Sequence, residues 1–232
     1  MQPVITIDGG AGTGTSSLAE ELASRLGASM LNSGSIYRAL TWLCLEHGIE
    51  IDKYTGLTDA SARSAVVELA QSLHVEFKSG EVIHANGRYV EPLQLRQMSP
   101  FTPFIAEIPE AREQIRRIQH RFAEDYGFII AEGRDLGTVV FPNAIRKIFL
   151  RCDDVERARR RSNAEHRRVT VADLQQRDAI DAERDESPME AHIHALVFDT
   201  TNTSVPELAQ NVINSMRGVP ELINHIAQAD RG

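Results

Sequence analysis

Pro3-Val4-Ile5-Thr6-Ile7-Asp8 runs directly into Gly9-Gly10-Ala11-Gly12-Thr13-Gly14-Thr15-Ser16-Ser17, and this stretch decides the fold. Its first half is apolar and β-branched, which predicts a short buried strand. After its glycine-rich second half, leucines at 18, 22 and 26 predict an amphipathic helix. A glycine-rich turn between a strand and a helix lets consecutive backbone N–H groups point at an anion. We therefore expect a phosphate-binding loop over residues 9–17.

The loop departs from the usual phosphate-binding pattern at one position. G-x-x-x-x-G-K-[ST] fits Gly9 and Gly14, and Ser16 takes the place of the magnesium ligand. Position 15, where the pattern has lysine, is Thr15. The alternative for this stretch alone is a glycine-rich turn that binds no ligand. The choice between the two depends on residues elsewhere in the chain.

Composition narrows the class of protein. The 232 residues are 42% hydrophobic and 25% charged, which allows one domain with insertions or two small domains. A net charge of −8 argues against a broad nucleic-acid-binding surface but allows a local cationic pocket. No apolar run approaches membrane-spanning length. Cys44 and Cys152 have no metal-ligand spacing, so we expect reduced thiols, as in a cytoplasmic protein. From the net charge and the lack of a long apolar run, we expect neither a nucleic-acid nor a membrane partner.

Four more apolar runs predict strands, separated by segments of helical spacing. They lie at 28–31, 128–131, 147–150 and 195–198. This alternation predicts an α/β fold with a five-stranded parallel sheet and helices on both faces, whose ligands bind at the carboxyl ends of the strands. The loop at Gly9, Ser33, Arg134 and Asp135 all follow predicted strands at that edge.

The middle of the chain changes its period. Residues 74–78, 81–84 and 88–90 are short extended runs separated by Ser79-Gly80 and Asn86-Gly87, and the second pair is a strong hairpin signal. We interpret this as a small antiparallel sheet inserted into the α/β chain.

Arginines are concentrated in the second half of the chain. Residues 156–161 read Glu-Arg-Ala-Arg-Arg-Arg, and two more arginines follow at 167 and 168. Like charges at helical spacing repel, so we interpret the run as a mobile cationic flap whose cations lack partners until polyphosphate arrives. A solvated basic surface is the alternative. Arg177, Asp181 and Arg184 share one predicted helix face, where simple salt bridges are the alternative to a ligand site.

Together these segments resemble bacterial cytidylate kinase, a nucleoside monophosphate kinase. Position 33 opens Ser-Gly-Ser-Ile-Tyr-Arg, which matches D-[ST]-G-x-[IM]-Y-R except at Asn32. Residues 133–142, Gly-Arg-Asp-Leu-Gly-Thr-Val-Val-Phe-Pro, match a highly specific family motif. The resemblance extends through the arginine-rich flap and Arg177-Asp178-x-x-Asp181-x-x-Arg184, and covers Val4 to about Gly218.

The resemblance implies an activity and a site. The family transfers the γ-phosphoryl group of ATP, with Mg²⁺, to CMP or dCMP. It implies ATP phosphate binding by Gly9, Gly10, Ala11, Gly12, Thr13, Gly14, Thr15, Ser16 and Ser17, with Ser16 on the metal. It implies CMP binding by Ser33, Arg38, Thr102, Arg112, Arg134, Asp135, Arg177, Asp181 and Arg184. It implies catalytic roles for Arg134, Arg157, Arg160 and Arg161.

The hydrogen-bonding groups of cytosine agree with the residues that the resemblance assigns to base recognition. Cytosine offers an amino donor and two acceptors, so a carboxylate paired with an arginine suits it. Asp135 and Arg112 take those roles by resemblance.

The family also implies a P-loop kinase fold with a P-loop core over 1–38, 105–155 and 170–218, a monophosphate-binding insertion over 39–104, a lid over 156–169 and a tail over 219–232. We expect a monomer.

Two departures leave an alternative open. Thr15 removes the cation that would reach the β- and γ-phosphates, and Asn32 weakens the hold on magnesium. Pro103 and Ile180 also depart from the family pattern, but at positions of less consequence for phosphoryl transfer. Removing a preorganised cation from a dry site costs about 2.7–4 kcal/mol of barrier. The rivals to an active cytidylate kinase are therefore a catalytically weak or inactive nucleotide-binding homologue and a kinase for a different small acceptor.

Overall fold

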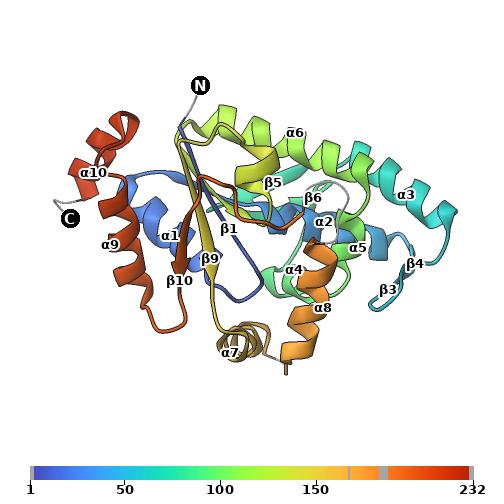
Figure 1. Ribbon diagram of the computed structural model, residues 1–232. Helices are drawn as coiled ribbons and strands as arrows, with labels where there is room; N and C mark the ends of the chain where they lie inside the picture. The colour runs from blue at the N-terminus through green and yellow to red at the C-terminus, as the bar shows by residue number, and fades with distance from the viewer. Residues whose placement is uncertain (1–2, 167, 183–187, 230–232) are drawn as a thin grey trace.

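A five-stranded parallel sheet forms the centre of the protein (Figure 1). The computed structural model describes residues 3–166, 168–182 and 188–229. The strand order is β10-β9-β1-β8-β2, and every neighbouring pair is parallel. The strands are β1 (Val4–Gly9), β2 (Ser29–Asn32), β8 (Ile129–Gly133), β9 (Arg146–Arg151) and β10 (Leu196–Asp199). The sheet predicted from five apolar runs is therefore confirmed.

Helices cover both faces of this sheet, because its strands alternate apolar side chains between two cores. Ile5 and Ile7 pack with the helices on one face, which are α1 (Thr15–Leu26), α9 (Val205–Ser215) and α10 (Ile223–Ala229). Val4 and Leu31 belong to the other core, with α2 (Ser33–Glu46) and α6 (Pro109–Tyr126). Figure 1 shows these two groups on opposite sides of β1 and β9.

The insertion packs onto the second core. Its hairpin sheet is β5 (Val75–Lys78), β6 (Glu81–Ala85) and β7 (Arg88–Tyr89). Its helix α3 (Ala60–Gln71) packs against α2 and α6. The Asn86-Gly87 turn has left-handed backbone at both residues, with φ of 49° and 74°, which explains the glycine. The antiparallel insertion is confirmed, and its apolar residues form one continuous cluster with the sheet face.

Several elements had no counterpart in the sequence prediction. They are the short hairpin β3 (Ile51–Asp52) and β4 (Gly56–Leu57), the helices α4 (Pro92–Gln97) and α5 (Thr102–Ala106), and the π-helix η1 (Leu136–Val140). Leu57 pairs in the short hairpin, and Asp59 caps α3 by accepting from the Ala62 N–H at 2.8 Å, so the helix begins only after both residues.

The remaining elements lie beyond the carboxyl ends of the strands or at the end of the chain. They are α7 (Asp154–Glu165), α8 (Val171–Ala182) and the 3-10 turn η2 (Pro220–Leu222). Figure 1 shows α7 and α8 at the edge where β1 and β9 end. Across the described ranges no helix is both long enough and apolar enough to cross a membrane.

Candidate active site

The loop between β1 and α1 has the backbone that its glycines predict. Gly12 and Gly14 adopt left-handed φ angles of 81° and 96°, which bulkier residues rarely adopt. Thr13 donates from both its N–H and its hydroxyl to the Gly10 carbonyl, at 3.3 and 2.8 Å. The first turn of α1 holds no acidic residue and no side-chain cap. Its N–H groups and positive dipole end therefore remain available to an anion.

The side chains of Thr15 and Ser16 converge on a carboxylate from the neighbouring strand. Thr15 Oγ1 donates to Glu132 Oε2 at 2.7 Å, and Ser16 Oγ donates to Glu132 Oε1 at 2.9 Å. Glu132 is buried at the carboxyl end of β8. The Thr15 hydroxyl is therefore already engaged with Glu132.

A cavity of about 330 Å³ opens in front of this loop and collects most of the predicted site. The predicted residues that line it are Gly10, Ala11, Gly12, Gly14, Thr15, Ser16, Ser17, Ser33, Arg38, Thr102, Arg112, Arg134, Asp135, Arg160, Arg161, Arg177 and Asp181. Gly9, Thr13 and Arg157 are not in the cavity wall. Arg184 lies outside the described residues, so its predicted role stays a prediction.

Among the residues that the structure describes, six arginines and three carboxylates line this cavity. The arginines are 38, 112, 134, 160, 161 and 177, and the carboxylates are Glu132, Asp135 and Asp181. Burial lowers the pKa of Arg177 to about 9, with the nearby Arg134 adding to the effect. At neutral pH Arg177 is still charged. The excess of fixed positive charge suits a polyanion.

Two of these guanidinium groups retain an unpaired donor. Among the described residues, the buried Nε atoms of Arg38 and Arg177 have no hydrogen-bond partner. Burial also lowers the pKa of Arg38, while Glu81 opposes that shift from 3.9 Å. A buried donor without a partner is costly, so both atoms are suited to an incoming acceptor.

A buried ion pair forms another part of the wall. Arg112 Nη2 pairs with Asp135 Oδ2, and Arg112 Nη1 donates to the Ala106 carbonyl at 3.0 Å. The Arg112 guanidinium also lies 5.7 Å from the centre of the Tyr37 ring. The structure therefore brings together the two residues expected to read the base, although they lie 23 positions apart.

Arg134 connects the loop to α8. Its Nε donates to Asp181 Oδ2 at 3.1 Å, and its Nη1 donates to the Gly9 carbonyl. Two of the residues expected to bind CMP, Arg134 and Asp181, are thus in contact with each other.

The arginine run on α7 differs from its prediction. The expectation that these cations lack partners is wrong for Arg157, Arg159, Arg160 and Arg161, because acidic residues three or four positions away or on α8 pair with them. Arg160 Nη1 also donates to Thr200 Oγ1 at 3.1 Å. The mobility of the segment stays a prediction.

Arg157 supports the loop from outside the cavity. Its Nε donates to the Ala11 carbonyl at 2.8 Å, and its other nitrogens pair with Asp154 and Asp178. A Cβ added to Gly12, whose φ is 81°, would lie 2.7 Å from the Arg157 carbonyl oxygen, so the packing requires glycine there. Arg157 therefore positions the loop, while Arg160 and Arg161 line the cavity.

Two acidic residues and one amide in or beside the site were not predicted from the sequence. Glu132 follows a predicted strand and precedes the specific motif, which is the signal that could have found it. Glu81 accepts from Asn32 Nδ2 at 2.6 Å, so an aspartate at position 32 would face Glu81 without a donor. Gln119 Nε2 donates to Ser33 Oγ at 2.7 Å and orients that hydroxyl.

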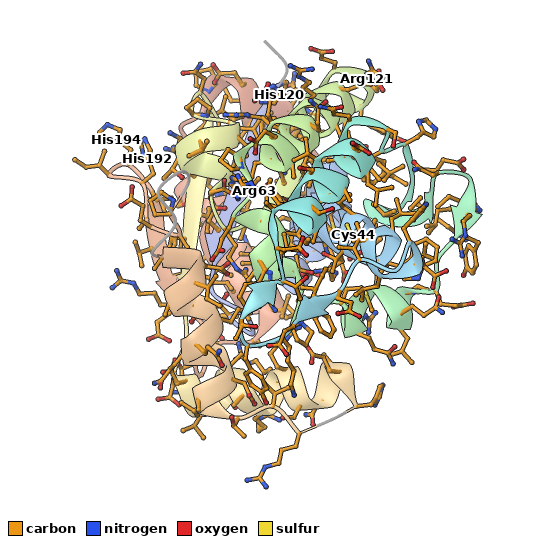
Figure 2. All side chains as sticks on the ribbon, turned by 90° about the vertical axis from the view of Figure 1, so that its right-hand side faces the viewer. Cys44, Arg63, His120, Arg121, His192 and His194 are labelled. Atoms are coloured by element: carbon orange, nitrogen blue, oxygen red, sulfur yellow. The ribbon has the colours of Figure 1, made fainter. Side chains whose placement is uncertain are left out.

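Most of the charge on α6 is solvated, as expected for an arginine-rich helix. Figure 2 labels Arg121 on this helix, and its side chain is exposed, as is that of Arg117. Arg112 is the exception, since it is buried in the ion pair with Asp135. One helix thus carries both a solvent face and a site residue.

Comparison with known proteins gives one consistent result. A family model described as cytidylate kinase matches residues 5–218. The cytidylate kinase of Photobacterium profundum is 35% identical over 217 residues, which are 89% of this chain and 91% of that protein. Those of Shewanella loihica and Vibrio cholerae serotype O1 are 32% and 34% identical, covering 95% and 91% of this chain and 97% and 94% of theirs.

Proposed function

The chain belongs to the cytidylate kinase family and is a nucleoside monophosphate kinase, and we propose that its arginine-lined cavity is where the γ-phosphoryl group of ATP passes to CMP or dCMP. The products are ADP and CDP or dCDP. The comparisons do not favour the alternative of an inactive nucleotide-binding homologue.

One observation carries the assignment to this cavity. The glycine-rich loop, six arginines and the buried Arg112–Asp135 pair line the same space. Phosphoryl transfer needs aligned donor and acceptor and cations around the equatorial oxygens. A cavity that combines an anion-binding loop with a reader suited to cytosine supports both requirements.

The acceptor nucleotide uses side chains. Asp135 would accept from the cytosine amino group, and Arg112 would donate to its acceptors, with Ser33 and Thr102 beside them. Arg38 and Arg134 would hold the CMP phosphate, while Asp181 and Arg177 would contact the ribose. Arg184 completes the proposed phosphate contacts.

The donor nucleotide uses mainly backbone. N–H groups of residues 9–17 would hold the ATP phosphates at the N-terminus of α1. The oxygens of Ser16 and Glu132, 2.9 Å apart, are hard donors that fit Mg²⁺. When bound, Mg²⁺ supplies charge neutralisation on the phosphates.

The lid over 156–169 would complete the site. Arg160 and Arg161 already line the cavity and would stabilise negative charge on the transferring group. Closure of this segment would exclude water, while Arg157 keeps the loop in shape. The division into P-loop core, insertion and lid remains part of this proposal.

We extend the proposal to the working form of the enzyme. We propose that the enzyme works as a monomer. Its substrates are the small nucleotides ATP, CMP and dCMP, and we place it in the cytoplasm with no nucleic-acid or membrane partner.

A coupled assay tests the function. ATP and Mg²⁺ are supplied with CMP, dCMP, UMP or AMP, and ADP production is followed. We expect turnover with CMP and dCMP well above that with AMP, which lacks an acceptor equivalent to cytosine O2. Turnover with AMP above that with CMP would assign the site to another acceptor, and binding of CMP without turnover would support the inactive alternative.

A further inference from the structure

Asp8 is a buried carboxylate at the end of β1 with no role in the reaction described above. Its Oδ1 accepts from the Leu136 N–H and its Oδ2 from the Gly137 N–H, both at 2.8 Å. These two N–H groups begin the π-helix η1, directly after Arg134 and Asp135. One side chain therefore holds the segment that carries two acceptor-site residues.

The packing around this contact leaves little freedom. A Cβ on Gly137 would lie 2.8 Å from Thr6 Oγ1 and 3.2 Å from Asp8 Oδ2. Gly9, the next residue after Asp8, accepts from Arg134 Nη1. The end of β1 is thus tied to residues 134–137 at three points, and a shift of that segment would move Asp135 relative to Arg112.

We propose that Asp8 is a positioning residue for CMP, whose ionised carboxylate fixes the segment 134–137 so that Arg134 and Asp135 face the acceptor nucleotide. This inference rests on the proposed function of the cavity. It assigns Asp8 to the acceptor side, although the residue precedes the donor loop in sequence.

The protonation state of Asp8 gives this role a pH signature. Burial raises the pKa of Asp8 to about 7, the two N–H groups lower it, Asp135 raises it and Arg134 lowers it. Lys147 on β9 also interacts with Asp8, and its own pKa is lowered by burial. Protonation turns one acceptor oxygen into a hydroxyl and weakens one of the two backbone contacts.

Stability and function respond to acid in opposite directions. The folded pKa lies above the ordinary value of 3.8, so the folded state binds the proton more tightly than the unfolded state between those values. The contribution of Asp8 to stability therefore rises as pH falls from about 7 and is lost as pH rises through that value. CMP affinity should fall over the same acid range.

The test compares Asp8→Asn with Asp52→Asn, a control in which an exposed aspartate likewise accepts from two backbone N–H groups, at Tyr54 and Thr55. The amide of Asp8→Asn would turn a donor towards one of the two N–H groups. We expect the KM for CMP to rise about tenfold while the KM for ATP changes less than twofold. Asp52→Asn should change neither value.

The pH profile supplies the second measurement. Substrate phosphates also titrate near pH 6, so we follow the ratio of the KM for CMP in Asp8→Asn to that in wild type, where this common effect cancels. The ratio should shrink between pH 8 and pH 6. Equal losses for CMP and ATP, no loss, or a constant ratio would overturn the inference.

A third measurement avoids the variant altogether. Cytidine carries no phosphate, so calorimetric titration of wild type with cytidine at pH 8 and pH 6 reports on the base and ribose contacts. Weaker binding at pH 6 together with an unchanged or higher melting temperature supports the inference, and equal binding at both pH values contradicts it. Absence of both CMP binding and CMP turnover in wild type would instead reject the proposed function, and this inference with it.

Discussion

The proposed donor loop and the proposed acceptor wall of the cavity are built from different groups. The loop over residues 9–17 offers backbone N–H groups and neutral side chains, and the hydroxyls of Thr15 and Ser16 are directed at Glu132. The acceptor wall offers charged side chains already paired, as in Arg112–Asp135 and Arg134–Asp181. We infer from this difference that arginines elsewhere in the cavity supply part, but not all, of the side-chain charge missing from the loop.

The difference between the two regions also suggests that substitutions in them should change different kinetic constants. Preformed charge pairs order the acceptor wall before CMP arrives, which reduces the cost of binding. Backbone donors bind ground-state phosphate well but add little charge as the transition state forms. Acceptor-wall variants should therefore raise the KM for CMP, while variants of the cations around the loop should change turnover.

Arg134→Ala should have the largest effect, because Arg134 contacts both regions. It loses the bonds to Gly9 and Asp181, and a cation leaves a partly buried site. We expect kcat/KM for CMP to fall about a thousandfold. Arg63→Ala, on the exposed side of the insertion (Figure 2), is the control and should be close to wild type. A loss under tenfold in steady-state kinetics would remove Arg134 from the link between the regions.

Asp135→Asn should break the acceptor wall more selectively. The amide can donate as well as accept, so its hydrogen bond to the cytosine amino group is weaker, and Arg112 loses its charged partner. CMP affinity should fall about a hundredfold while ATP affinity stays within a few-fold, as measured by calorimetric titration. Asp59→Asn at the cap of α3 is the control. Equal losses for CMP and ATP would exclude Asp135 from base recognition.

Arg160→Ala sharpens the comparison on the donor side. Arg160 lies 3.8 Å from a Cβ built on Gly14, whereas Arg159 on the same helix is 64% exposed and pairs with the same Glu156. Turnover should fall by some tens of fold, since a charge-assisted contact is worth about 1.5–3 kcal/mol, with CMP affinity nearly unchanged. Arg159→Ala is the matched control. Similar rates in the two variants would show that Arg160 does not supply the missing charge.

The fold could be predicted wherever the signal is local. Continuous apolar runs indicated the parallel strands, and Asn86-Gly87 indicated the hairpin, because each depends on a few adjacent residues. The π-helix η1 could not be predicted, since its first N–H groups are held by Asp8 from another strand. The short helices α4 and α5 likewise begin in segments without a clear period.

For the site, too, local motifs could be predicted from the sequence and long-range contacts could not. Motif residues indicated the phosphate loop and the Arg112–Asp135 reader. The role of Glu132 depends on Thr15 and Ser16, more than a hundred positions away. Arg157 was predicted to be a catalytic cation, but its contacts with the Ala11 carbonyl and with Asp178 on α8 hold it outside the cavity wall. Contacts between segments distant in the sequence determine whether a side chain lines the cavity or supports it from outside.

Turnover of CMP by Thr15→Lys, compared with wild type and with Thr15→Met, tests the central claim most directly. The claim is that this is an active kinase whose loop lacks a side-chain cation. Lysine and methionine are similar in size, so only the charge differs between the variants. We predict measurable wild-type turnover, a gain of at least tenfold in Thr15→Lys, about 1.4 kcal/mol of barrier, and no gain in Thr15→Met. Equal rates in wild type and Thr15→Lys would show that the arginines already supply all the charge required. Inert proteins that still bind CMP would contradict the account.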